Sequence, residues 1–291
     1  MMNNFIEQTI DLLKRSDIFI RQTEIRPVEF NYSEGTKTKK IYLSCNDSYG
    51  GANLSNNFIL QTMIIFTVLD ATIDVQYPEL QGESYRKKYQ SLPNVTDDEI
   101  IFKEIFRVFK LFRNASVHSM SSINYAADKV SVSYVYRQTS YNIEISKYGF
   151  ELLFTYIIDI LNPLKQLTSH HHTSLNRKIY DEIKEEIAIF NDEFGSNLID
   201  ISNAIRLKRT VRYRIVNPKF LKVAENIQIT SIYEVESQAE DYYGVDYFIK
   251  VNSCQYLIPA EMLNDNKISL NEMQQWILQE LYYIIKYPLH K

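Results

Sequence analysis

The feature that most restricts the fold of this chain is one long amphipathic helix, predicted over about residues 96–118. Its start is marked by the segment Thr96-Asp97-Asp98-Glu99, a capping box in which the Thr hydroxyl and the Glu carboxylate bond to the first backbone amides. Lys103, Arg107 and Lys110 occupy the remainder of the helix. The helical period places six large apolar side chains on one wide face: Ile101, Ile105, Phe106, Val108, Phe109 and Phe112.

Other helices are predicted around this one. Apolar residues recur at helical spacing in 4–20, 58–75 and 147–161, and Asn53 or Ser55 is a suitable cap for the second of these. We therefore expect the first half of the chain to be mainly helical.

Strands are also expected in this half. Residues 129–146 alternate between apolar and polar types and predict a β-hairpin with its turn near 138–140. A shorter alternating run, 39–45, predicts a strand or an extended loop, and 78–95 predicts a loop with a short helix.

The length of the chain and one polar stretch within it predict a division into two parts. The 291 residues are 45% hydrophobic and 23% charged, which is ordinary globular composition, and the length suggests about two domains. The polar stretch 168–174 looks like a boundary, after which a charged helix (175–190), several strands and a closing helix (270–286) are predicted. We predict an α+β protein with a helical domain, 1–167, that carries the hairpin, and a smaller mixed domain, 173–291.

Several function classes are excluded or disfavoured by composition. Seven glycines, with no P-loop and no G-x-G-x-x-G, argue against ordinary ATPases and Rossmann dehydrogenases, and no cofactor is expected. Two cysteines and no secretion signal favour the cytoplasm. The most apolar stretch, 58–73, is interrupted by polar residues, so we interpret it as a buried helix and expect no membrane partner.

The residues that carry chemistry are Arg113-Asn114-Ala115-Ser116-Val117-His118, at the end of the long helix. Asn114 and His118 lie one helical turn apart, and Arg113 is offset from His118 by about 140°. A guanidinium binds phosphate through paired hydrogen bonds, and an imidazole exchanges a proton near neutral pH. This set can cleave RNA without a metal ion, with Asn114 orienting its neighbours.

This context resembles the HEPN superfamily, the helical ribonucleases of bacterial toxin–antitoxin, abortive-infection and CRISPR systems, whose motif is R-x4-6-H. The resemblance implies a metal-independent endoribonuclease with catalytic Arg113 and His118 and a supporting Asn114. It also implies a homodimer in which two motifs share a cleft, and an antitoxin or another defence-system protein as a partner. Members paired with nucleotidyltransferase antitoxins carry H-x-Y, whereas this chain has Met120 at the third position.

Two other interpretations of the motif remain open. Some members of the superfamily are inactive and bind only proteins or nucleotides, so a non-catalytic module is the alternative function. The spacing R-x4-H also arises by chance, and cationic residues are favoured at helix C-termini for purely structural reasons.

A basic segment without acidic residues is a second candidate, for RNA binding. Its residues are Arg206, Lys208, Arg209, Arg212 and Arg214. In the run V-R-Y-R-I, strand alternation predicts that Val211, Tyr213 and Ile215 face a core and that Arg212 and Arg214 face outward. A basic strand beside an aromatic residue can follow a phosphate backbone, although a simply solvated strand has the same pattern.

Three further features have structural interpretations. His170, His171 and His172 are expected to lie in a solvated linker, since consecutive histidines cannot all bind one metal ion. The long helix has four phenylalanines, which form more apolar surface than one side of a helix needs for its own core: Phe102, Phe106, Phe109 and Phe112. Part of that surface is therefore predicted to contact a second protomer. The 22 tyrosines can stack on unpaired bases, but codon bias in an AT-rich genome is the preferred explanation, since Ile, Asn and Lys are plentiful too.

Overall fold

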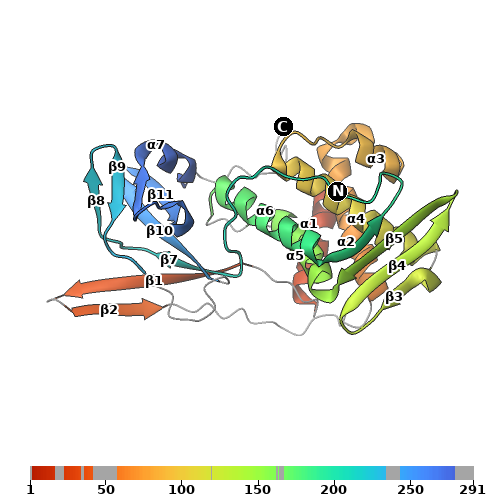
Figure 1. The fold of residues 1–291 in the computed structure, drawn as a ribbon, viewed down its shortest axis with the longest axis horizontal. Coiled ribbons are helices and arrows are strands. Elements are labelled where there is room, and N and C mark those ends of the chain that lie inside the picture. The colour runs from red at the N-terminus through yellow and green to blue at the C-terminus, as the bar shows by residue number, and fades with distance from the viewer. Residues whose placement is uncertain are drawn as a thin grey trace.

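The computed structural model of the chain describes residues 2–16, 23–33, 36–41, 58–118, 120–161, 163, 167–233 and 243–278. The fold is α+β, as the sequence predicts. Helices form the centre of the molecule, a four-stranded sheet lies at one end, and the remaining strands lie at the other end (Figure 1).

The central helices share one apolar core with the four-stranded sheet. They are α1 (Met2–Arg15), α2 (Phe58–Gln76), α3 (Tyr85–Ser91), α4 (Asp97–His118), α5 (Lys147–Leu161) and α6 (Ser169–Glu186), with a 3₁₀ turn at Pro78–Leu80. α4 packs against α2, α3 and α6 and against strands of the sheet. It is therefore the central element of this half, as its wide apolar face predicts.

The capping box at the start of α4 is confirmed. The Thr96 hydroxyl accepts a hydrogen bond from the Glu99 amide at 3.3 Å, and a Glu99 carboxylate oxygen accepts from the Thr96 amide at 2.9 Å. These bonds fix the first turn of the helix, because they satisfy amides that have no partner within it.

The phenylalanines of α4 are used within the core of the same chain. Phe106, Phe109 and Phe112 have no exposed surface, and Phe102 is partly buried against the same core. Their rings contact aromatic rings of α2 and α5. The expectation that part of this surface is left for a second protomer is therefore wrong for these three residues, because α2 and α5 already cover it.

The predicted hairpin is confirmed and forms part of a larger sheet. Its antiparallel order is β3 (Ile123–Tyr125), β4 (Lys129–Tyr136), β5 (Thr139–Ser146) and β6 (Ile187–Asn191). Arg137 and Gln138 connect the hairpin with positive φ angles of 45° and 67°, as a two-residue type I′ turn requires. The sequence does not predict β6, since it lies where the charged helix was expected to continue.

The opposite end of the molecule contains two more sheets. The larger has the order β11 (Cys254–Pro259), β10 (Tyr243–Val251), β7 (Val211–Ile215), β1 (Glu24–Ser33) and β2 (Thr36–Ile41). The smaller has the order β12 (Lys267–Ser269), β9 (Asn226–Ile229) and β8 (Phe220–Val223), followed by α7 (Leu270–Met273) and a 3₁₀ turn, Gln274–Trp276. The predicted closing helix, 270–286, starts at Leu270 but ends at Trp276, because Ile277 is extended and forms an antiparallel bridge with Tyr256. Its residues beyond 278 lie outside the described residues.

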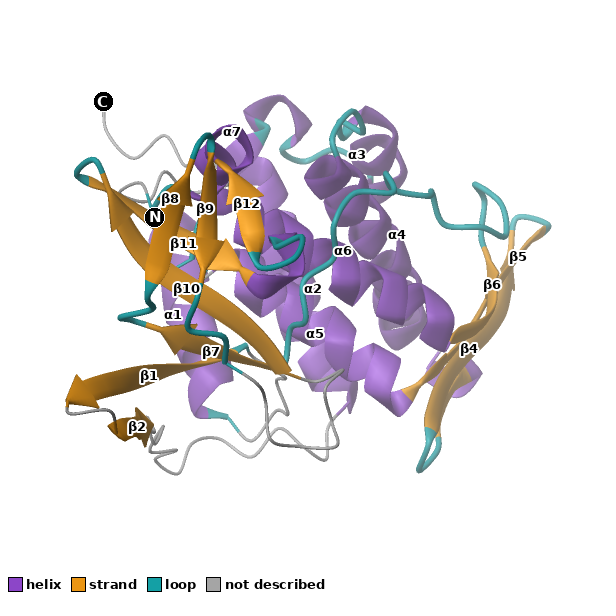
Figure 2. Ribbon diagram, turned by 60° about the vertical axis from the view of Figure 1, so that its left-hand side comes forward, coloured by secondary structure: helices purple, strands orange, loops and turns teal. Residues whose placement is uncertain are grey.

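The two apolar cores divide the chain differently from the predicted boundary. β1 pairs in parallel with β7, so residues 24–41 belong to the sheet of the second core. Conversely, α6 and β6 pack on the first core, although they follow the predicted boundary. Figure 2 shows β1 beside β7 and β6 beside β5. The strand pairings between distant segments, and not the polar stretch 168–174, set the limits of the cores.

α2 is the buried apolar helix that the sequence predicts. Its length and hydropathy alone would suffice for a membrane span, but more than half of it is buried within the protein. Ile65, Val68, Leu69 and Ile73 have no exposed surface. The helix therefore contributes its apolar residues to the first core.

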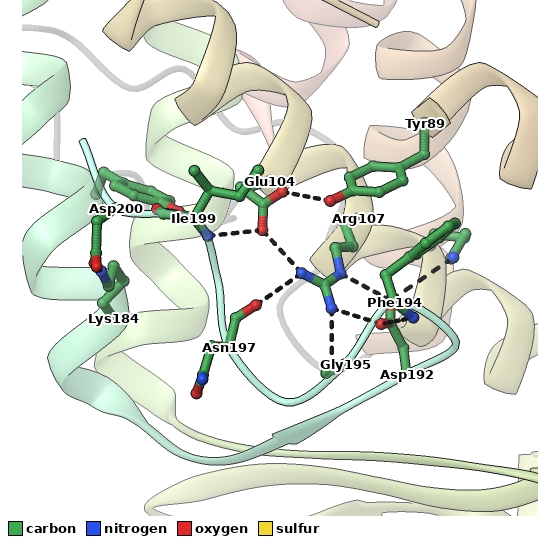
Figure 3. Close-up of polar contacts among 12 residues, drawn as sticks. Tyr89, Glu104, Arg107, Lys184, Asp192, Phe194, Gly195, Asn197, Ile199 and Asp200 are labelled. Carbon is green, nitrogen blue, oxygen red and sulfur yellow. Dashed lines mark hydrogen bonds and ion pairs between the residues drawn. The ribbon is translucent and has the colours of Figure 1, made fainter. Parts of the chain in front are cut away.

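A buried arginine joins α4 to the segment after β6. Arg107 is 2% exposed, and all five of its N–H donors are used (Figure 3). Its Nε and one terminal nitrogen bond to the two carboxylate oxygens of Asp192 at 2.9 and 2.6 Å. The other bonds reach Glu104 and the carbonyl oxygens of Gly195 and Asn197.

Neighbouring groups complete this network. Glu104, fully buried, accepts hydrogen bonds from the Tyr89 hydroxyl of α3 at 2.7 Å and from the Ile199 amide at 3.3 Å. Lys110 bonds to Glu193 at 2.5 Å. Glu104, Arg107 and Lys110 in the middle of α4 are therefore buried like its apolar residues, and each has an opposite charge beside it, as burial requires.

We predict that Asp192→Asn destabilises the protein by about 3–5 kcal/mol, because it leaves the buried Arg107 charge without its main partner. Chemical denaturation followed by circular dichroism measures this change. The control is Glu83→Gln, which breaks the exposed pair with Lys87 on α3 and costs less than about 1 kcal/mol. Equal effects of the two changes would contradict the structural role assigned to the buried pair.

Candidate active site

The sequence-predicted residues Arg113, Asn114 and His118 lie in the last turns of α4. Arg113 and Asn114 are half-buried, and His118, the last residue of the helix, is exposed. Arg113 and Asn114 are joined by a hydrogen bond, whereas His118 is bonded to neither. α4 is held in place by its caps and buried contacts, so the position of this helix end is fixed by the core.

Arg113 differs from the other arginine of this helix because its charge is not neutralised by an ion pair. One terminal nitrogen donates to the side-chain oxygen of Asn114 at 3.2 Å, and the guanidinium lies 4.9 Å from the centre of the Tyr85 ring. Within the described residues, no carboxylate lies at ion-pair distance from it. The guanidinium is therefore oriented by a ring and an amide while most of its donors stay available.

Two tyrosines of the hairpin extend the site beyond the predicted motif. Tyr134 and Tyr141, opposite each other on β4 and β5, stack with ring centres 4.9 Å apart and planes at 6°. The Asn114 amide lies beside the Tyr134 hydroxyl, and burial raises the pKa of that hydroxyl above its usual value. The sequence analysis missed this pair, although the density of tyrosines in the predicted hairpin was a signal for it.

These groups can bind and act on an anion. Arg113 offers N–H donors for a phosphate, His118 offers an exposed imidazole at the helix end, and the tyrosines offer ring faces for stacking. Within the described residues, no cluster of three metal-ligating side chains occurs anywhere.

The basic segment from Arg206 to Arg214 does not form the exposed basic strand that the sequence predicts. Arg212 has no exposed surface: its guanidinium bonds to both carboxylate oxygens of Asp246 and to Glu261. The expectation that Arg212 faces outward is therefore wrong. The physical reason is that Asp246 of β10, Glu261 after β11 and His171 of α6 surround its guanidinium, so other segments cover this part of β7.

The other basic residues of this segment are also engaged or partly buried. Arg206 pairs with Asp181 at 2.7 Å, and Arg209, 4% exposed, pairs with Glu182 at 2.9 Å. Lys208 and Arg214 are partly buried, and burial lowers the pKa of Arg214. The segment thus joins α6 to the second sheet through ion pairs, which leaves little of its charge for a ligand.

The histidine triplet is not a solvated linker. His170, His171 and His172 form the first turn of α6, and His171 is fully buried against the ring of Trp276. Its Nδ1 lies 2.7 Å from the Thr168 hydroxyl and its Nε2 lies 3.3 Å from Asp246. The prediction failed because the Thr168 cap starts a helix there, which turns the middle histidine toward the second sheet.

Comparison of the chain with protein-family models, with curated proteins and with solved structures finds no match. The function is therefore inferred below from the geometry of the site.

The buried His171 predicts a loss of stability in mild acid. Burial lowers its pKa, and the neighbouring Asp246 carboxylate opposes only part of this shift. As the pH falls below about 6.5, the unfolded chain binds a proton that the folded chain does not, so the free energy of unfolding falls by at most about 1.4 kcal/mol per pH unit.

Denaturation of the wild type and of His171→Gln at pH 7, 6 and 5 measures this contribution. We expect the stability difference between the two proteins to shrink as the pH falls, because the variant lacks the titrating group. The control Ser84→Ala removes the cap of α3, whose hydroxyl accepts from the Lys87 amide and contacts no histidine within the described residues, so its cost of about 1 kcal/mol should be the same at each pH. A pH-independent difference for His171→Gln would refute the assignment.

Proposed function

We propose that this protein is a metal-independent endoribonuclease of the HEPN type. The observation that carries the proposal is the end of α4, where a half-buried arginine without an ion-pair partner among the described residues is followed by an exposed histidine. The other two arginines of α4, α5 and α6 are Arg107 and Arg177, and each of them pairs with a carboxylate. Among the arginines of α4, α5 and α6, Arg113 is thus the one that the described residues leave available for an external anion.

The proposed roles follow from the chemistry of each group. His118 exchanges a proton with the RNA 2′-hydroxyl or with the leaving oxygen. Arg113 stabilises the charge that develops on the phosphate, and the ring of Tyr85 below it limits its orientations. Asn114 accepts from Arg113 and thereby leaves its own amide N–H groups for a second contact.

The hairpin supports single-stranded RNA as the substrate. Tyr134 and Tyr141 lie beside Asn114 as a stacked pair, and stacked tyrosine rings bind unpaired bases with little sequence preference. Since three arginines of the basic segment are already paired with acids, we place the principal RNA contacts here and not on β7.

The resemblance to HEPN proteins extends the proposal to the assembly. Two copies of the motif would face each other across a homodimer, and an antitoxin or another defence-system protein would regulate the enzyme in the cytoplasm. The interface would lie near the exposed end of α4, because the phenylalanines in the middle of this helix are covered within the chain.

A non-catalytic HEPN-like module that binds proteins or nucleotides is the second candidate function. The observation that favours it is that no described residue hydrogen-bonds to the His118 imidazole. A general base is usually oriented by a second group, so a free imidazole suits binding as well as catalysis.

Incubation of the pure protein with total RNA in EDTA tests the proposal. We expect cleavage that persists without divalent ions, and we expect His118→Ala to reduce its rate by about 10²–10⁴-fold. His170→Ala, which removes an exposed histidine from α6, is the matched control and should cleave like the wild type. An inactive wild type would favour the second candidate, and equal rates for wild type and His118→Ala would exclude His118 as the acid or base.

Substitution of the hairpin tyrosine tests where the RNA binds. Tyr134→Leu should raise the KM by about 5- to 100-fold, the loss expected for one stacked base, while kcat at saturating RNA changes little. Tyr136→Leu, which removes an exposed ring beside the hairpin turn, is the control and should keep the wild-type KM. A wild-type KM for Tyr134→Leu would move the RNA away from this sheet.

A further inference from the structure

A cavity of about 400 Å³ lies at the opposite end of α4 from Arg113 and His118. It is bounded by the end of α2, the loop before α4, the first turns of α4 and α6, and the last turns of α5. Its volume is in the range of pockets that bind small molecules. Five segments of the first half of the fold form its walls, and it opens to solvent on one side.

One polar group of the wall has no partner in the protein. Tyr156 of α5 lines the cavity and is 1% exposed. Within the described residues, no group hydrogen-bonds to its hydroxyl, and burial raises its pKa well above the usual value. Because Tyr156 lines the cavity, its hydroxyl is available for a hydrogen bond to a ligand there, without loss of a bond inside the protein.

The charged groups of the wall are all acidic. Asp98, Glu99 and Asp159 line the cavity, and no lysine or arginine is among its described lining residues. Asp98 is held in place by Thr173 and Asn176 at 2.5 and 3.2 Å. These fixed carboxylates make the cavity electronegative and favour a cation over an anion.

The remaining wall is partly apolar and aromatic and partly polar, with the side chains of Gln76, Thr96, His172 and Asn176. Tyr77, Phe102, Ile160 and two prolines contribute the apolar and aromatic part. Within the described residues no three metal-ligating side chains come together, so the wall lacks the ligand cluster that a bound metal ion requires. An organic cation with an apolar body satisfies both the carboxylates and the aromatic surface.

We propose that this cavity binds a small organic cation, with an ammonium group at the carboxylates and a ring-sized apolar body between Phe102 and Ile160, positioned by a polar group that bonds to the Tyr156 hydroxyl. The site is separate from the proposed nuclease centre, because the 20 residues of α4 between Asp98 and His118 span about 30 Å. A negative binding test would therefore leave the proposed RNA cleavage unaffected, and a negative cleavage test would leave the proposed cation binding unaffected.

Two probes of similar size and opposite charge test the charge preference. Tyramine carries an ammonium group, and 4-hydroxyphenylacetate has the same ring with a carboxylate in place of the aminomethyl group. We expect tyramine to raise the Tm of the full chain and to give a saturable heat in titration calorimetry, and 4-hydroxyphenylacetate to do neither. Binding of both probes, or of neither, would overturn the proposal.

The variant Tyr156→Phe tests the hydroxyl. It should weaken tyramine binding by about 3- to 10-fold, as the loss of one hydrogen bond does, and leave the Tm of the free protein unchanged or higher. Tyr180→Phe is the matched control, since the Tyr180 hydroxyl donates to the Ile199 carbonyl at 2.7 Å. It should lower the Tm by about 2–4 °C and keep the wild-type affinity for tyramine.

The two variants also separate a structural role from a binding role. If Tyr156→Phe lowers the Tm as Tyr180→Phe does, the Tyr156 hydroxyl has a partner in the protein and the proposal fails. The same conclusion follows if Tyr156→Phe binds tyramine as tightly as the wild type does.

Discussion

The ion pair between Arg107 and Asp192 is the interaction on which the central helical layer depends. α4 is buried on nearly every side, so a cation in its middle turns is compatible with folding only if an acid reaches it. Asp192 does so because the segment after β6 folds back along α4 and adds the carbonyl oxygens of Gly195 and Asn197. The same bonds fix the direction of α4 and, with it, the place of Arg113 and His118.

The sequence predicts those parts of the fold that are specified over a few neighbouring residues. Thr96 and Glu99 predict the start of α4, because both partners of the capping box lie within one helical turn of each other. The hairpin is equally local, since alternation and a two-residue turn define β4 and β5 together. The sequence also predicts that Arg113, Asn114 and His118 lie at the end of the long helix, and they lie in the last turns of α4.

Features that depend on distant segments could not be predicted in this way. Arg212 and Val211 alternate like a surface strand, but Asp246 of β10 and Glu261 after β11 pair with the Arg212 guanidinium and bury it. His171 looked solvated because its partners, Asp246 and Trp276, are more than 70 residues away in the chain. In each case a polar side chain that local pattern assigns to solvent is instead paired inside the protein, as buried polar groups must be.

Arg107 and Arg113 show why pairing is more informative than residue type. They lie six residues apart on one helix, yet Arg107 uses all five N–H donors on protein groups, whereas Arg113 uses one on Asn114 and rests on a tyrosine ring. At the other end of α4, Tyr156 and Tyr180 differ in the same way. Folded proteins pair most of their polar groups internally, so the remaining donors of Arg113 and the hydroxyl of Tyr156, for which the described residues provide no partner, are available to a ligand.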